Sequence, residues 1–256
     1  MTSEDKFLFD LQGYLVVKNV LSPEEVDHLN VIMDRELPDS YGENGVKGTS
    51  RVSLWDKACQ NLFDHPNVLP YLLELMGPKF RADHDYCIMM EKGAKRGNLH
   101  GGDIEYATGR AGDHWYKYRD GVMRNGLTVF TYNLTPAKKG DGGFACVPGS
   151  HKSNFPMDLP KDVRTFERIP NYVCQPEADA GDVIIFTEAL IHGTMPWNGD
   201  HERRALLYKF SPGHSSWSLD YYNADAYEGL TEQQKRILTP PCVGNRPDVV
   251  EITEEY

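Results

Sequence analysis

The sequence predicts an α+β domain whose helices come first and pack outside a β-sandwich or jelly-roll core. Two observations indicate this order: amphipathic helical patterns occupy the first part of the 256 residues, and short β segments take over after His100. Barrels of this size routinely form one domain, and neither an internal repeat nor a linker divides the chain. We therefore expect a single domain over residues 1–256.

Three helices are predicted before the β-rich part. The first covers residues 6–12. The second starts at Ser22-Pro23, where serine caps, proline suits the first turn, and Glu25 completes a capping box. The third opens at His65-Pro66 and stops at Gly77-Pro78.

Strands are predicted where β-branched and aromatic residues cluster between turn residues. The expected ranges are 13–18, 80–91, 127–134, 143–147, 172–175, 182–186 and 203–211. Residues 39–50 are expected to form a loop. The insertion at 101–125 is rich in aromatic and charged residues, and a loop of that length is usually functional. We expect it to form an active-site lid, with ordinary loop packing as the alternative.

Composition restricts the partners. Lysine and arginine number 27 against 38 acidic residues, a net charge of −11, which argues against nucleic acid and anionic membranes. The five cysteines contain no CxxC and suggest no disulfide framework. The N-terminus lacks signal-peptide character, and no apolar run is long enough to span a bilayer. These features predict a cytoplasmic protein that acts on a small molecule.

Two histidines are the main candidates for chemistry. His100 and His192 each lie beside glycine near a predicted strand, and glycine leaves room for an approaching ligand or metal. Asp103 follows His100 closely. Two imidazoles and a carboxylate with open positions form the typical site of mononuclear non-haem iron.

An arginine pair adds a candidate anion site. Successive side chains of a strand alternate between faces, so only one of Arg203 and Arg204 can point into a barrel. A guanidinium buried there requires an anion, and its planar fork matches a carboxylate.

Several stretches together resemble one family. They are residues 13–17 (Gly-Tyr-Leu-Val-Val), 21–25 (Leu-Ser-Pro-Glu-Glu), 140–152 (ending Pro-Gly-Ser-His-Lys), 180–186, His192-Gly-Thr and Arg203-Arg-Ala. In combination, over most of the chain, they resemble the phytanoyl-CoA dioxygenase-like (PhyH) members of the Fe(II)/2-oxoglutarate oxygenases.

The resemblance implies a cupin-like double-stranded β-helix that holds Fe(II) and the co-substrate 2-oxoglutarate and uses O2 to oxidise a C–H bond. Carried over by position, His100 and His192 would bind the metal. Arg203 would bind the distal carboxylate of 2-oxoglutarate with help from Thr194. Weaker candidates for the cofactor or substrate wall are Thr131 and Asn133.

The sequence departs from the family pattern at the second metal ligand. The pattern is His-x-Asp, but Gly102 stands two positions after His100 and Asp103 is one residue late. A regular strand would turn Asp103 to the opposite face, whereas a bulge at the glycine pair would bring it back to the metal. His-x-Gly also resembles 2-oxoglutarate-dependent halogenases, in which chloride occupies the vacant position on iron.

Three classes of function therefore stay open. The first is an Fe(II)/2-oxoglutarate oxygenase, with hydroxylation ahead of halogenation and a small polar or amphipathic substrate. The second is a cupin-like metalloenzyme without redox chemistry. The third is a catalytically silent relative that keeps the fold for binding.

Overall fold

The computed structural model describes residues 1–101, 114–155 and 159–251. The helices are α1 (Ser3–Gln12), α2 (Pro23–Glu36), α3 (Lys57–Gln60), α4 (Leu69–Met76), α6 (Lys161–Arg164) and α7 (Glu232–Leu238). The strands are β1 (Tyr14–Val17), β2 (Val46–Lys47), β3 (Phe80–Met90), β4 (Tyr116–Arg119), β5 (Val122–Asn125), β6 (Thr128–Asn133), β7 (Gly143–Cys146), β8 (Val183–Thr187), β9 (His192–Met195) and β10 (Arg203–Pro212).

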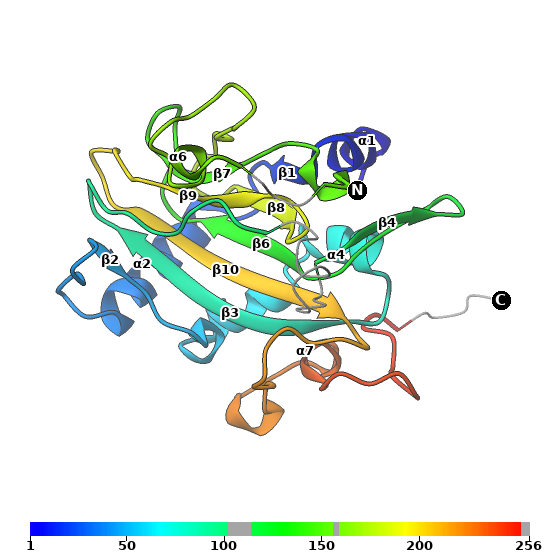
Figure 1. Cartoon of the computed structure of the whole chain (residues 1–256). Coiled ribbons are helices and arrows are strands. Elements are labelled where there is room, and N and C mark those ends of the chain that lie inside the picture. The colour runs from blue at the N-terminus through cyan, green and yellow to red at the C-terminus, as the bar shows by residue number, and fades with distance from the viewer. Residues whose placement is uncertain (102–113, 156–158, 252–256) are drawn as a thin grey trace.

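The strands form one large antiparallel sheet and two small ones, so the fold is mixed α/β. The large sheet has the order β1-β8-β6-β10-β3-β2. The β7–β9 pair lies over one of its faces, and the β4–β5 hairpin projects from one end (Figure 1). Helices α2 and α4 cover the opposite face, where residues such as Leu29 and Leu72 pack with Phe130 and Leu206.

Capping accounts for the starts of α1 and α2. The third helix, expected to open at His65-Pro66, instead begins at Leu69, where α4 has no side-chain cap. Ser22 accepts a hydrogen bond from the Glu25 amide, and the Glu25 carboxylate accepts one from the Ser22 amide, which confirms the capping box of α2. Thr2 and Asp5 form the same arrangement at α1, so this helix starts before residue 6.

The predicted strands are present with three corrections. Residues 172–175 make only one isolated bridge, Cys174 to Cys146, because prolines at 170 and 176 remove amide donors on either side. Strand β9 was not expected, since His-Gly-Thr-Met has weak strand character and its pairing with β7 decides its conformation. Strand β2 lies within the segment expected to be a loop.

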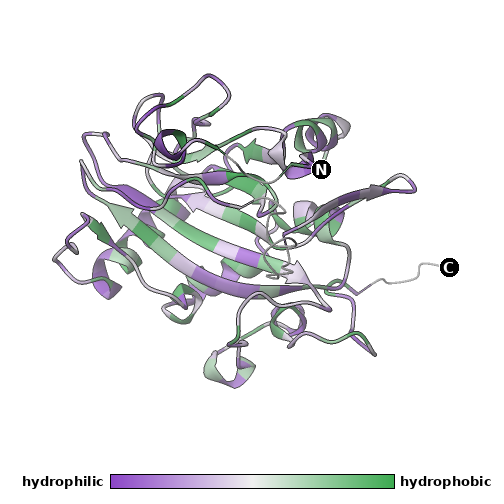
Figure 2. Cartoon of the chain, in the orientation of Figure 1, coloured by the Kyte–Doolittle hydropathy of each residue, from purple (hydrophilic) through white to green (hydrophobic). Residues whose placement is uncertain are grey.

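Both faces of the large sheet are covered, yet its strands carry polar residues. Every residue of β6 is buried, including Thr128, Thr131 and Asn133. Figure 2 shows hydrophilic bands crossing the largely apolar strands of this sheet. Buried polar groups need hydrogen-bond partners, so the polar residues on the face under β7 and β9 indicate a ligand-binding site there. Across the described residues, no helix is both long and apolar enough to cross a bilayer.

The turn at residues 148–152 docks onto the end of α1 through His151. The ring Nε2 of His151 donates to the Asp10 carbonyl at 3.1 Å, and Tyr116 packs edge-on against the imidazole. Burial lowers the pKa of His151 to about 4, with a smaller contribution from Lys152. The imidazole therefore folds in its neutral form, and His151 has a structural role in this turn.

We expect this histidine to make stability depend on pH. Because its folded pKa lies below the ordinary value of 6.5, its contribution is complete above pH 6.5 and is lost as pH falls toward 4. The loss should reach about 3 kcal/mol. Urea unfolding at pH 7.5 and 4.5 should show a smaller acid-dependent loss for His151→Gln than for wild type. The exposed His214→Gln serves as control, and equal losses in all three proteins would contradict the assignment.

Candidate functional site

Backbone pairing brings the two predicted histidines together. The His100 amide donates to the His192 carbonyl at 2.7 Å, and the His192 amide donates back at 2.8 Å. Their ring centroids are 4.4 Å apart. His100 thus extends the β7–β9 sheet by one bridge, and His192 is the first residue of β9.

Both imidazoles have the protonation pattern of metal ligands. The Nδ1 of His100 lies 2.7 Å from the Asn98 carbonyl, and the Nδ1 of His192 lies 2.8 Å from the Leu190 carbonyl. A carbonyl only accepts, so each Nδ1 carries the proton and each Nε2 keeps its lone pair. Burial lowers the pKa of His192 to about 4 even though Glu188 opposes the shift, so this imidazole is neutral at physiological pH.

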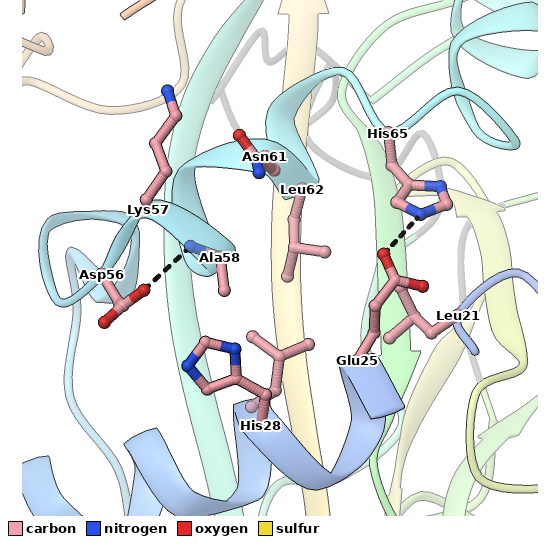
Figure 3. Close-up of a pocket in the computed structure, with 10 residues that line it drawn as sticks. Leu21, Glu25, His28, Asp56, Lys57, Ala58, Asn61, Leu62 and His65 are labelled. Atoms are coloured by element: carbon pink, nitrogen blue, oxygen red, sulfur yellow. Dashed lines mark hydrogen bonds and ion pairs between the residues drawn. The ribbon is translucent and has the colours of Figure 1, made fainter. Parts of the chain in front are cut away.

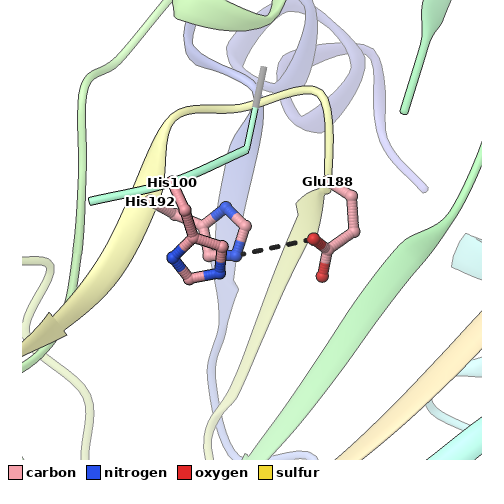
Figure 4. A group of neighbouring side chains, drawn as sticks. All are labelled: His100, Glu188 and His192. Atoms are coloured by element: carbon pink, nitrogen blue, oxygen red, sulfur yellow. Dashed lines mark ion pairs between the residues drawn. The ribbon is translucent and has the colours of Figure 1, made fainter. Parts of the chain in front are cut away.

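The structure adds a carboxylate that the sequence analysis missed. Glu188 is 3% exposed, and its Oε2 lies 3.7 Å from His192 Nε2 (Figure 4). Its Oε1 accepts from Lys209 Nζ at 2.6 Å. Burial would raise the pKa of Glu188, but Lys209 and His192 outweigh it and hold the pKa well below its usual range. A charged residue inside the apolar run of residues 183–191 was the available signal.

One donor atom from each of His100, Glu188 and His192 lies within 4.8 Å of the other two. Ligands about 2 Å from one transition-metal ion lie roughly 3–4 Å from one another. The three side chains therefore suit a shared divalent cation with little rearrangement. Asp103, the carboxylate expected from the sequence, and Gly102 lie outside the described residues.

Glycine permits this approach of backbones. Gly101 has φ +86°, and a Cβ there would lie 2.6 Å from the Leu190 carbonyl and 2.9 Å from the Glu188 carbonyl. A Cβ on Gly193 would lie 2.7 Å from the Asn98 carbonyl. These glycines allow the segment around His100 to lie against the turn before β9. The sequence analysis had expected them to leave room for a ligand or metal, but backbone atoms take up that room.

The two histidines line a cavity of about 190 Å³ that also receives the predicted arginine. Arg203 is 4% exposed, and within the described chain it has no carboxylate partner. Its Nη1 lies 3.6 Å from the sulfur of Met90. Burial lowers the pKa of Arg203 to about 10. Arg204 points to the other face and pairs with Asp34 and Glu202, which confirms the predicted alternation.

Thr194, expected to assist Arg203, and one of the two weaker candidates share this cavity. Thr131 and Thr194 line it, and the Oγ1 of Thr131 is buried without a hydrogen-bond partner. Asn133 does not line it, because its amide donates to the carbonyls of Thr131 and Asp182. The structure thus gives Asn133 a role in holding the sheet rather than in the cavity wall.

A second cavity, of about 340 Å³, lies on the helical side between α2 and α3 (Figure 3). Its polar groups serve local structure. Glu25 caps α2 and lies 3.3 Å from His65, and Asp56 caps α3 through the Ala58 amide. The polar groups of this second cavity are therefore explained by local structure, whereas those of the cavity beside His192 are not.

Breaking the Glu188–Lys209 pair should reduce stability. Glu188→Gln leaves a buried ammonium unpaired, which typically costs about 3–5 kcal/mol. Glu188→Gln/Lys209→Met should recover most of that loss, because no buried charge is left alone. Urea unfolding at pH 7 measures both. The exposed Lys92–Asp200 pair is the control, and Asp200→Asn should leave the unfolding curve nearly unchanged, because solvent screens this pair. Additive losses in the double variant would contradict this coupling.

Solved structures with the same fold bind metal and 2-oxoglutarate. HygX from Streptomyces hygroscopicus, with nickel and 2-oxoglutarate bound, aligns over 88% of this chain and 94% of its own, with a TM-score of 0.74 and 20% identity. The α-ketoglutarate-dependent epimerase SnoN from nogalamycin biosynthesis aligns over 96% of each chain, with a TM-score of 0.64 and 16% identity. The related carbocyclase SnoK covers 84% of this chain and 85% of its own, with a TM-score of 0.62 and 17% identity.

A search of curated protein sequences found no match. The family model for phytanoyl-CoA dioxygenase (PhyH), however, matches residues 9–205. That range contains β1, both histidines, Glu188 and Arg203. The chain therefore belongs to the PhyH family.

Proposed function

We propose that this protein is an Fe(II)/2-oxoglutarate-dependent oxygenase that hydroxylates a C–H bond of a small polar or amphipathic molecule. One observation carries the proposal: Arg203 is buried, with no carboxylate partner among the described residues, in the cavity that also receives His100 and His192. An isolated buried charge is costly, so this guanidinium suits a ligand that brings its own carboxylate. The double-stranded β-helix belongs to the same proposal, supported by β7 and β9 packing over the large sheet.

The side chains in this cavity suit both Fe(II) and 2-oxoglutarate. The free Nε2 atoms of His100 and His192 would hold the metal, and Arg203 with the Thr194 hydroxyl would bind the distal carboxylate of 2-oxoglutarate. Thr131 offers a further hydroxyl without a partner. Bound Fe(II) and 2-oxoglutarate supply the chemistry that uses O2 to oxidise the substrate. The chain's own contribution is to fix the co-substrate and to keep the His192 imidazole neutral.

The cleft next to this cavity suits a substrate that has both polar and apolar parts. The cleft measures about 410 Å³ and shares Tyr86, Arg96 and Lys209 with the cavity wall. His84 and Trp217, with ring centroids 4.9 Å apart, complete an aromatic side. Aromatic faces and cations together suit a polar or amphipathic molecule better than a bare hydrocarbon. The insertion at 101–125, expected to act as a lid, lies outside the described residues over 102–113, and its described part forms the β4–β5 hairpin. In this proposal residues 1–256 form a single domain.

Halogenation is the second candidate, and Gly102 motivates it because this position of the His-x-Asp pattern offers no carboxylate. The solved structures of similar fold include an epimerase and a carbocyclase, so the reaction outcome varies within this fold. A non-redox metalloenzyme would not need Arg203 in the cavity, and a silent relative would not hold the metal. Products formed with and without chloride discriminate the two oxidative outcomes.

Arg203→Met should weaken 2-oxoglutarate binding by about 10- to 100-fold, because hydrogen bonds between charged groups contribute roughly 1.5–3 kcal/mol. Anaerobic titration of the Fe(II)-loaded protein, followed by the visible charge-transfer band of the chelate, measures the affinity. Arg204→Met is the matched control, since this neighbouring side chain points away from the cavity. No band in wild type, or equal affinity of the two variants, would overturn the proposed function.

A further inference from the structure

Glu188 is the only carboxylate that the described residues place with both histidines. It lies four positions before His192, in the turn between β8 and β9, rather than two positions after His100. Its position is fixed by backbone contacts, since its amide donates to the Leu127 carbonyl and its own carbonyl packs against Gly101. This carboxylate is therefore built into the site and is not a mobile surface group.

We propose that Glu188 supplies the carboxylate ligand of the metal, in place of the aspartate of the His-x-Asp pattern. The inference rests on the proposed function and specifies its metal centre. The ligand set would then be two imidazoles and one carboxylate, with the glutamate and the distal histidine in a Glu-x-x-x-His arrangement. Gly102 would need no substitute, and no position on the metal would be reserved for chloride.

The simpler explanation of Glu188 is that it only neutralises Lys209. The geometry argues against this, because the two carboxylate oxygens are used differently. Lys209 Nζ lies 2.6 Å from Oε1, whereas Oε2 lies on the side of His192 Nε2, at 3.7 Å. That nitrogen is the one whose lone pair the Leu190 carbonyl leaves free. The carboxylate oxygen and the imidazole nitrogen thus face each other, as two ligand atoms of one metal ion would.

Lys209 acts as a positioning residue in this arrangement. It lies on β10, six residues after Arg203 and on the same face, and its side chain is 13% exposed. By holding Oε1, it keeps Glu188 from rotating and leaves Oε2 as a single ligand atom. His114, whose Nε2 lies 3.8 Å from Oε2, is a second neighbour of the same oxygen.

Metal binding without turnover tests the proposal. Co(II) is titrated anaerobically into wild type, Glu188→Gln and Asp103→Asn, and its visible absorption reports affinity and coordination. Glu188→Gln should weaken binding by on the order of 100-fold or more, beyond the 10- to 100-fold typical of losing an outer partner of a ligand. Asp103→Asn should bind like wild type. Glu202→Gln is the matched control, because Glu202 also pairs with a β10 cation but lies away from the histidines.

The variants must be folded for this comparison, which circular dichroism and thermal unfolding establish. Glu188→Gln/Lys209→Met leaves no buried charge unpaired, so its loss of Co(II) binding reports the ligand and not a folding defect. Retention of metal by Glu188→Gln or by the double variant, or an equal loss in Asp103→Asn, overturns the assignment of Glu188. If the wild-type protein still shows the charge-transfer band of the Fe(II)/2-oxoglutarate chelate in those cases, the proposed function is retained. Wild type that binds no Co(II) removes the proposed function instead.

Discussion

The alternation of side chains along β10 is the constraint on which the site depends. This strand pairs with β3 on one side and β6 on the other, so its register is fixed along nearly its whole length. Arg203, Leu207 and Lys209 therefore face the cavity. Leu206 and Tyr208 face the helices and join the larger core. A shift of one residue would move both cations into that core.

Lys209 connects this strand to the metal donors. Its ammonium holds Glu188, Glu188 lies beside His192, and His192 pairs through its backbone with His100. Three elements distant in sequence are thus held by one continuous set of polar contacts. The glycines at 101 and 193 are needed because side chains there would separate the backbones. Removing either Glu188 or Lys209 leaves the other as a buried charge without its partner.

The alternation of side chains along β10 also gives the cavity wall an excess of positive charge. Arg96, Arg203 and Lys209 contribute positive charge to its wall, whereas Glu188 is the carboxylate beside them. An anionic co-substrate would correct this imbalance, since low polarity around the cavity strengthens attraction between opposite charges. On the opposite face, Glu25 and Asp56 have local structural roles, because they cap α2 and α3.

The sequence by itself determined the start of α2, most strands and the choice of His100 and His192 as candidates. Capping boxes, period-two alternation and glycine positions act locally, so Ser22, Glu25 and the opposed directions of Arg203 and Arg204 were predictable. Tertiary structure alone decided β9, whose weak local preference is overruled by pairing with β7. It also decided the place of Glu188, because Lys209 and His192 join it through contacts between separate strands, and no local pattern encodes such contacts.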